Sequence, residues 1–363
     1  MNTASAADSR AAAGYRAPWW LPGGDLQTIY PALCIRKPAV AYLRERWDTP
    51  CGQDFIDVDL VAGASPAAPC VLLFHGLEGS SDSHYARALM ALVAARGWHG
   101  AIPHFRGCSG EANLAPRFYH SGDAEELDWI IRRLRPRHPG PFYVAGVSLG
   151  GNALLRWLGE QGHAAGIIDA AAAVSAPLDL AAGGAALSSG FNRLYTRMFL
   201  QTLKPKALAK LERFPGLFDR DRLLAANDLY SFDNVVTAPL HGYRDTDDYW
   251  HRASARHVLH DIVVPTLVLN ARNDPFLPGR HLPQSAAPAV TLEYPDTGGH
   301  VGFATGPAFP PFSGRLDWLP QRILRFYDDV AGRRDPSTGQ PAPAHARAGA
   351  PAAVPSLQPW TTS

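Results

Sequence analysis

The sequence lacks any run of about 18 apolar residues, the length that a membrane-spanning helix requires. Its first segment, Met1 to Tyr15, is rich in alanine and serine and has neither the basic start nor the apolar core of a secretory signal. These two absences favour a protein of the cytoplasm.

Cysteine is scarce. The four cysteines are far apart and form no C-x-x-C pair: Cys34, Cys51, Cys70 and Cys108. A disulfide framework or a zinc site needs closely patterned cysteines, so we expect reduced thiols and no metal.

An excess of charge of either sign is also missing. Charged residues make up 18% of the chain and the formal net charge is +1, so nothing indicates nucleic acid or an anionic surface as an obligatory partner. Hydrophobic residues make up 46% of the 363 residues. This is enough for one large α/β domain with an insertion, or for two smaller domains. No internal repeat is visible.

The most informative stretch is Phe142 to Leu158, which reads as a buried strand, a turn and an amphipathic helix. The turn contains the pattern Gly146-x-Ser148-x-Gly150. Such a pattern also recurs by chance, but a strand before it and a helix after it are typical of a nucleophile on a sharp turn. The sequence therefore predicts Ser148 as a nucleophile.

Strands alternate with helices over most of the chain. Besides the strand before Ser148, the pattern predicts strands at 40–48, 54–61, 70–74, 100–105, 167–174, 263–269 and 290–294, the first two as an antiparallel pair. Helices are expected at 84–96, 122–135 and 316–330. This order predicts a mostly parallel eight-stranded sheet with helices on both faces.

The alternation fails between the sixth and seventh strands, where the pattern is helical. We therefore predict a cap inserted over the carboxyl ends of the strands. Trp19 and Trp20 would be costly to leave in water, so their segment is expected to be an arm that packs on the main domain. The predicted organisation is a flexible tail (1–16), a core (17–177 and 261–332, with the arm at 17–39), the cap (178–260) and a disordered tail (333–363).

A serine nucleophile needs a base, and the base needs an orienting acid. Two loops that follow predicted strands supply them, with Asp274 after the seventh strand and His300 on a glycine-flanked loop after the eighth. Asp296 and Asp179 are alternative positions for the acid. Asp296 is equally suited to being a turn residue, and Asp179 follows the preceding strand; both are less favoured than Asp274.

The oxyanion of such a reaction needs two backbone N–H donors. The pattern assigns them to Leu149, directly after the nucleophile, and to Leu77, in the loop after the third strand. His75 is expected to support that loop through hydrogen bonds, and His104 and His120 are more typical of structural histidines. The glycines at 107–110 lack the lysine and spacing of a phosphate-binding loop, so a turn is the better interpretation.

These residues together resemble the α/β-hydrolase family, in its YheT-type branch. The resemblance spans about residues 18–332 and is carried by the stretches at 26–28, 75–80, 105–110, 119–123, 146–152, 273–276 and 299–303. It implies an α/β-hydrolase fold and a carboxylic-ester hydrolase without metal or organic cofactor, with Ser148, Asp274 and His300 as its triad. The lead-in Pro22-Gly23-Gly24-Asp25 departs from the family pattern.

The sequence thus predicts a two-step serine esterase of short-chain or monoacylglycerol-lipase type, whose partner is a small ester or acyl lipid. The same triad also serves acyltransferases and thioester or amide hydrolases, and a binding protein on this fold is a further alternative.

Four residues are candidates for the substrate pocket: His75, Phe191, Met198 and Phe276. The cap residues among them, with Leu194 and Phe199, are equally suited to packing the cap on the sheet. A row of cations, Arg197, Lys204, Lys206 and Lys210, allows a peripheral membrane contact, but a solvated helix face is the favoured interpretation.

Overall fold

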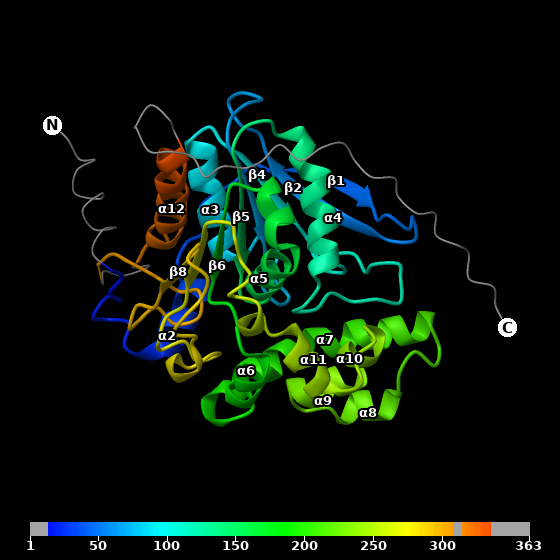
Figure 1. Cartoon of the computed structure of the whole chain (residues 1–363). Coiled ribbons are helices and arrows are strands. Elements are labelled where there is room, and N and C mark those ends of the chain that lie inside the picture. The colour runs from blue at the N-terminus through cyan, green and yellow to red at the C-terminus, as the bar shows by residue number, and fades with distance from the viewer. Residues whose placement is uncertain (1–13, 308–313, 335–363) are drawn as a thin grey trace.

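The computed structural model describes residues 14–307 and 314–334 (Figure 1). The tails expected at 1–16 and 333–363 lie mostly outside the described residues. Where they are described, the expectation is wrong. Tyr15 is buried and its hydroxyl donates to Ala304 O at 2.8 Å, and helix α12 (Trp318–Arg334) continues past residue 332.

An eight-stranded sheet forms the centre of the molecule, in the order β1-β2-β4-β3-β5-β6-β7-β8. The pairs β1–β2 and β2–β4 are antiparallel and all others are parallel, which confirms the predicted sheet. Strand β7 begins at Thr266 rather than at 263, since Pro265 has no N–H to donate to a ladder. The strands are β1 (Leu43–Asp48), β2 (Phe55–Val61), β3 (Cys70–Phe74), β4 (His99–Pro103), β5 (Phe142–Val147), β6 (Ala170–Val174), β7 (Thr266–Leu269) and β8 (Val290–Glu293).

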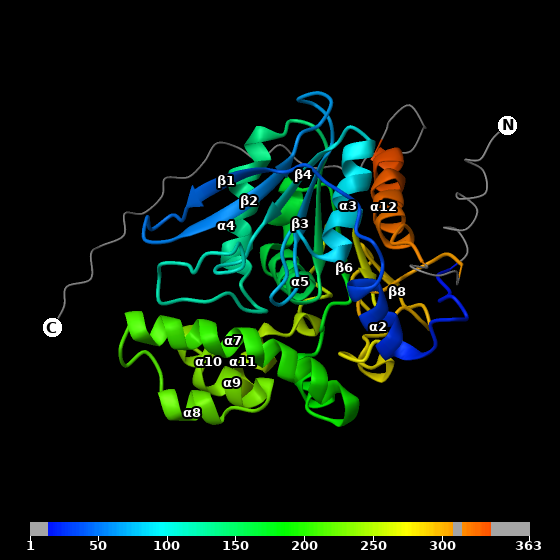
Figure 2. The ribbon, with the colours of Figure 1, turned by 180° about the vertical axis from the view of Figure 1, so that it is seen from behind.

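Helices cover both faces of this sheet, as predicted. Helices α4 (Ala124–Leu134) and α5 (Leu149–Gln161) pack on one face, and α3 (His84–Ala95) and α12 pack on the other (Figures 1 and 2). Helix α4 carries acidic residues in its first turn and arginines in its last, the polarity that a helix dipole favours. The central strands are apolar throughout because both of their faces are covered.

Between β6 and β7 the chain forms helices, which make up the cap beside the carboxyl ends of the strands (Figures 1 and 2). The buried Asn152 of α5 joins cap and core: its amide donates to Ser121 O and Ala253 O and accepts from Ala255 N. The cap helices are α6 (Leu180–Leu187), α7 (Arg193–Arg213), α8 (Arg220–Ala225), α9 (Leu229–Val235), α10 (Thr237–Leu240) and α11 (Thr246–Ala253).

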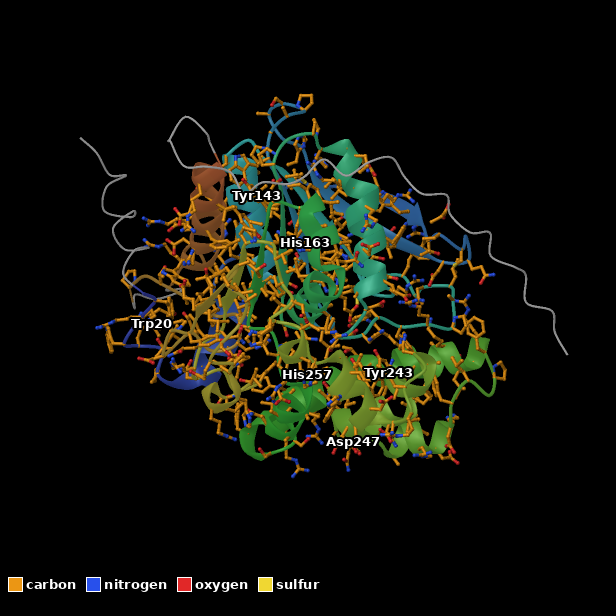
Figure 3. All side chains as sticks on the ribbon, in the orientation of Figure 1. Trp20, Tyr143, His163, Tyr243, Asp247 and His257 are labelled. Carbon is orange, nitrogen blue, oxygen red and sulfur yellow. The ribbon has the colours of Figure 1, made fainter. Side chains whose placement is uncertain are left out.

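The arm includes helix α2 (Gly23–Leu33) and packs on the core, on the side away from Tyr243 and Asp247 of the cap (Figure 3). Trp20 packs edge-on against Tyr30, and its indole N–H donates to Gly306 O at 3.1 Å. Trp19 is 86% exposed, so the expectation that both tryptophans are covered holds for one of them.

Candidate active site

Ser148 lies at the sharp turn between β5 and α5, with φ 54° and ψ −120°. A non-glycine residue rarely adopts a positive φ, because its Cβ then crowds the backbone. The turn closes because the neighbouring glycines leave room: a Cβ on Gly146 would lie 2.5 Å from Gly150 O, and one on Gly150 would lie 2.5 Å from His75 O. The local sequence thus forces the Ser148 side chain out of the turn.

Two loops bring an imidazole and a carboxylate to this serine. His300 Nε2 lies 2.9 Å from Ser148 Oγ, and His300 Nδ1 lies 2.9 Å from Asp274 Oδ2. The second carboxylate oxygen of Asp274 accepts from Phe276 N at 2.8 Å, and the side chain of Asp274 is 1% exposed. The ring of Phe276 stacks on the His300 imidazole at 4.0 Å. The three residues predicted from strand ends are therefore in one hydrogen-bonded chain.

The alternative acids lie elsewhere. Asp296 is 93% exposed and pairs with Arg272, and Asp179 caps the N-terminus of α6 and pairs with Arg256. His104 pairs with the buried Asp59, a structural arrangement. His120 lies on the pocket wall, where burial lowers its pKa to about 3. This pKa makes it a poor base at neutral pH.

Leu77 and Leu149, the two residues predicted to supply the oxyanion donors, both line the pocket at Ser148. Within the described residues, no hydrogen bond is formed by the N–H of Leu77 or of Leu149, whereas the N–H groups on either side of Leu77 both donate. Gly76 N donates to Tyr85 OH at 2.9 Å, and Glu78 N donates to Tyr119 OH at 2.8 Å. Leu149 is the first residue of α5, so its N–H is one of those that a helix leaves free.

His75 does not line the pocket, which corrects one prediction. It is fully buried behind the loop, where its Nδ1 lies 2.8 Å from Gly76 O and its Nε2 accepts from Phe105 N at 3.0 Å. Burial lowers its pKa to about 3, so it is a neutral support for the loop that carries Leu77.

The arm contributes to the site in a way that sequence reasoning missed. The buried side chain of Gln27 accepts, through Oε1, from Asn273 Nδ2 at 2.9 Å and from Gly298 N at 2.8 Å. Thr28 Oγ1 accepts from His300 N at 2.8 Å. One turn of α2 therefore holds the loops of Asp274 and His300 together. The sequence signal for this contact was the stretch 26–28, which contains Gln27 and Thr28 and is one of those that carry the family resemblance.

Glycines let the arm and these loops approach at backbone distance. A Cβ on Gly302 would lie 1.7 Å from Gln27 O, and a Cβ on Gly24 would lie 2.0 Å from Asn273 O. Gly24 of the unusual lead-in is thus required sterically, because no larger residue fits at this position.

The pocket in front of Ser148 has a volume of about 130 Å³ and walls from both core and cap. Its apolar wall includes Phe199 and Leu203 of α7, Phe232 of α9 and Trp250 of α11, besides Phe276. The prediction that Phe276 lines the pocket agrees with this placement.

One carboxyl group interrupts the apolar wall. Asp233 accepts from Thr237 Oγ1 at 2.6 Å and from Trp250 Nε1 at 2.9 Å. Burial raises its pKa to about 6. The hydrogen bond to Asp233 fixes the Trp250 indole. The ring of Trp250 packs so closely on Gly184 that a Cβ at Gly184 would lie 2.1 Å from it.

Phe191 and Met198 lie outside this pocket, which corrects two further predictions. They are 54% and 51% exposed, on the outer side of the cap. Helical register explains Met198, because Phe199 and Leu203, one turn apart, face the pocket and Met198 faces away from it. Phe191 precedes α7, in the short turn Gly190–Asn192. Neither interpretation of the cations, a membrane contact or a solvated helix face, fits Lys206 and Lys210, because these two side chains bind groups of the core.

Within residues 14–307 and 314–334 we find no group of three or more His, Cys, Asp or Glu side chains that could hold a metal ion. No helix in the same ranges is long and apolar enough to cross a membrane.

Comparisons with known proteins place this geometry in context. A family model described as alpha/beta hydrolase fold matches residues 69–307. The chain is 39% identical over 307 residues to “Putative esterase YheT” of Escherichia coli (strain K12), covering 82% of this chain and 88% of that protein. It is 33% identical over 291 residues to the mouse protein named Phospholipase ABHD3, covering 77% and 71% of the two chains.

Solved structures agree on the fold. Est1E from Butyrivibrio proteoclasticus, with ferulic acid bound, superposes with a TM-score of 0.51 at 12% identity, covering 81% of this chain and 100% of that one. The predicted fold class and the family resemblance are confirmed.

The arm contact leads to a test that depends on the reactivity of Ser148. Gln27→Ala leaves Gly298 N and Asn273 Nδ2 without their acceptor, which loosens both loops. We expect Ser148 to react with a fluorophosphonate about 10-fold or more slowly, since small displacements of an activating base are costly. Mass spectrometry of the adduct over time gives the rate. The control is Leu33→Ala, on the exposed side of α2, and equal rates for the two variants would contradict the clamp.

Proposed function

The chain belongs to the α/β-hydrolase family, in its YheT-type branch, and on this basis we propose that it is a serine carboxylic-ester hydrolase. The observation that carries the proposal is the hydrogen-bonded chain from Ser148 Oγ through His300 to the buried carboxylate of Asp274. A serine hydroxyl becomes a useful nucleophile when such a base accepts its proton.

The proposed reaction has two steps. Ser148 Oγ attacks the ester carbonyl carbon while His300 Nε2 takes its proton, and Asp274 stabilises the imidazolium. The N–H groups of Leu77 and Leu149 hold the oxyanion of the tetrahedral intermediate. His300 then protonates the leaving alcohol, and a water molecule, deprotonated by the same imidazole, releases the acid from Ser148.

We propose that the substrate is a small ester or an acyl lipid, of short-chain or monoacylglycerol type. A narrow, mostly apolar pocket of about 130 Å³ between core and cap suits an acyl group. The relatives named esterase and phospholipase support this substrate class. Acyl transfer, and thioester or amide cleavage, use the same triad and remain the alternatives that a substrate series tests.

The first test is hydrolysis of p-nitrophenyl esters from C2 to C12 by the wild type and Ser148→Ala. We expect kcat to fall by about 10⁴-fold or more in the variant with its fold retained, because the nucleophile is lost. The chain-length profile of the wild type measures the pocket. A wild type that neither hydrolyses these esters nor forms a fluorophosphonate adduct on Ser148 would favour the binding-protein alternative.

The assignment of the acid has its own test. Asp274→Asn removes the carboxylate that orients His300, so we expect kcat to drop by about 10³-fold or more. Asp296→Asn changes an exposed side chain and should leave kcat within about twofold. Steady-state kinetics on one p-nitrophenyl ester compares them, and a larger effect at Asp296 would overturn the assignment.

We also propose that the outer side of the cap contacts anionic lipid surfaces from which an acyl-lipid substrate is taken. Phe191, Leu194 and Met198 are about half exposed there. Phe191 and Leu194 border a surface hollow together with Arg193 and Arg197. Apolar side chains beside arginines are the combination that binds the interface of an anionic bilayer.

Vesicle sedimentation tests this surface. We expect the wild type to bind vesicles of phosphatidylcholine with phosphatidylglycerol, and Leu194→Ser/Met198→Ser to bind about 10-fold less, because apolar area is lost from the interface. Hydrolysis of a soluble short ester should be unchanged. Leu43→Ser, at the exposed edge strand β1, is the matched control. Equal binding by the variant and the control would rule the surface out.

A further inference from the structure

Helix α7 of the cap is attached to the core by cations on one face. Lys210 Nζ donates to Asn113 Oδ1 at 2.8 Å and to Ala115 O at 2.7 Å, and Arg213 donates to Asn113 O. Lys206, one turn before Lys210, forms an ion pair of 2.7 Å with Glu78. The spacing of four and three residues puts the three cations on the same side of the helix. Of these contacts, the one at Glu78 touches the loop of the candidate oxyanion hole.

Glu78 directly follows Leu77 and has a left-handed backbone, with φ 55°. Its own N–H donates to Tyr119 OH, and that hydroxyl donates back to Glu78 Oε1 at 2.8 Å. Tyr119 is buried and stacks on Phe105 at 5.1 Å, and burial keeps its pKa well above the ordinary value, so it remains a donor. The Tyr119 hydroxyl therefore bonds both the side chain and the backbone N–H of Glu78, which holds the carboxylate beside its own left-handed backbone.

The other carboxylate oxygen of Glu78 faces the cap. Its partner is Lys206, and the two side chains are 11% and 34% exposed. The ion pair is therefore partly buried, and the attraction between two charges is stronger there than at an open surface. A carboxylate held on both oxygens has one orientation, and the peptide before it, which carries the Leu77 N–H, is held with it.

We propose that Glu78 is a positioning residue for the oxyanion hole, and that Lys206 makes its position depend on the cap. The inference rests on the proposed function. Helix α7 also supplies Phe199 and Leu203 to the pocket wall, so the helix that covers the acyl group is the one that aligns the Leu77 N–H. When α7 moves away from the core, the Glu78 carboxylate loses its cation and the strained loop relaxes. Oxyanion stabilisation is then complete only with the cap in place.

The test compares Lys206→Met with Lys204→Met on the same helix. Lys204 donates to Leu224 O within the cap and does not reach the core loop, so its variant is the matched control. Loss of one oxyanion donor costs about 10²–10³-fold in kcat, and a loosened donor should cost about 10-fold. We expect Lys206→Met to lower kcat by about this factor and to weaken a trifluoromethyl ketone inhibitor equally, with KM within about twofold. Lys206→Arg should restore both.

Glu78→Gln, alone and with Lys206→Met, completes a double-mutant cycle. If Lys206 acts through Glu78, the double variant is no slower than Glu78→Gln. Unchanged kcat and inhibitor affinity in Lys206→Met, or a loss confined to KM, would overturn the proposal and leave a pocket-wall role for α7.

Fluorophosphonate labelling of Ser148 separates this inference from the proposed function, since the phosphoryl oxygen occupies the same hole without any ester being hydrolysed. Slower labelling of Lys206→Met in a protein that cleaves no ester would support the coupling and refute the esterase. Ester hydrolysis by the wild type, with Lys206→Met labelled as fast as the wild type, would support the esterase and refute the coupling.

Discussion

The close packing of backbone around Ser148 is the constraint on which the rest of the site depends. Ser148, the proposed nucleophile, keeps a positive φ because Gly146 and Gly150 let β5, α5 and the end of β3 meet at backbone contact. A single Cβ there would lie 2.5 Å from His75 O. The same approach brings the loop of Leu77 to the start of α5, so that Leu77 and Leu149 line one pocket together with Ser148. Strain at this turn is sustained by the sheet around it.

Buried polar contacts then place segments that are far apart in sequence. Gln27 and Asn273 are separated by 246 residues, yet the hydrogen bond between their side-chain amides joins the arm to the loop that carries Asp274. Under the loop that leads to Tyr119, Arg106 pairs with Asp54 and Glu126 at 2.6 Å each. Buried groups of this kind are costly when unpaired, so each partner specifies the position of the other. The cap, the loop that carries Leu77 and the arm are thus held in place by polar pairs as well as by apolar packing.

The sequence was most informative where the structural cause is local. The position of Ser148 on a sharp turn was predictable because strand, glycine-flanked turn and helix are encoded in consecutive residues. Asp274 and His300 were predictable as loop residues after strands, whose carboxyl ends meet at one edge of a parallel sheet. Predictions failed where side-chain direction decides the role. His75 supports its loop through hydrogen bonds as expected, but it does not line the pocket, and Phe191 and Met198 face solvent. Tyr15 is buried in a segment expected to be a tail.

The sequence by itself determined the order of strands and helices, the mostly parallel sheet and the loops that carry the proposed triad. Hydrophobic periodicity and turn chemistry act over a few residues and can be read directly from the chain. The tertiary structure alone decided that Gln27 and Thr28 hold the two loops, and that Lys206 of the cap reaches Glu78. These contacts depend on how distant elements pack, because a hydrogen bond needs its two atoms within about 3 Å, a distance that no local pattern encodes.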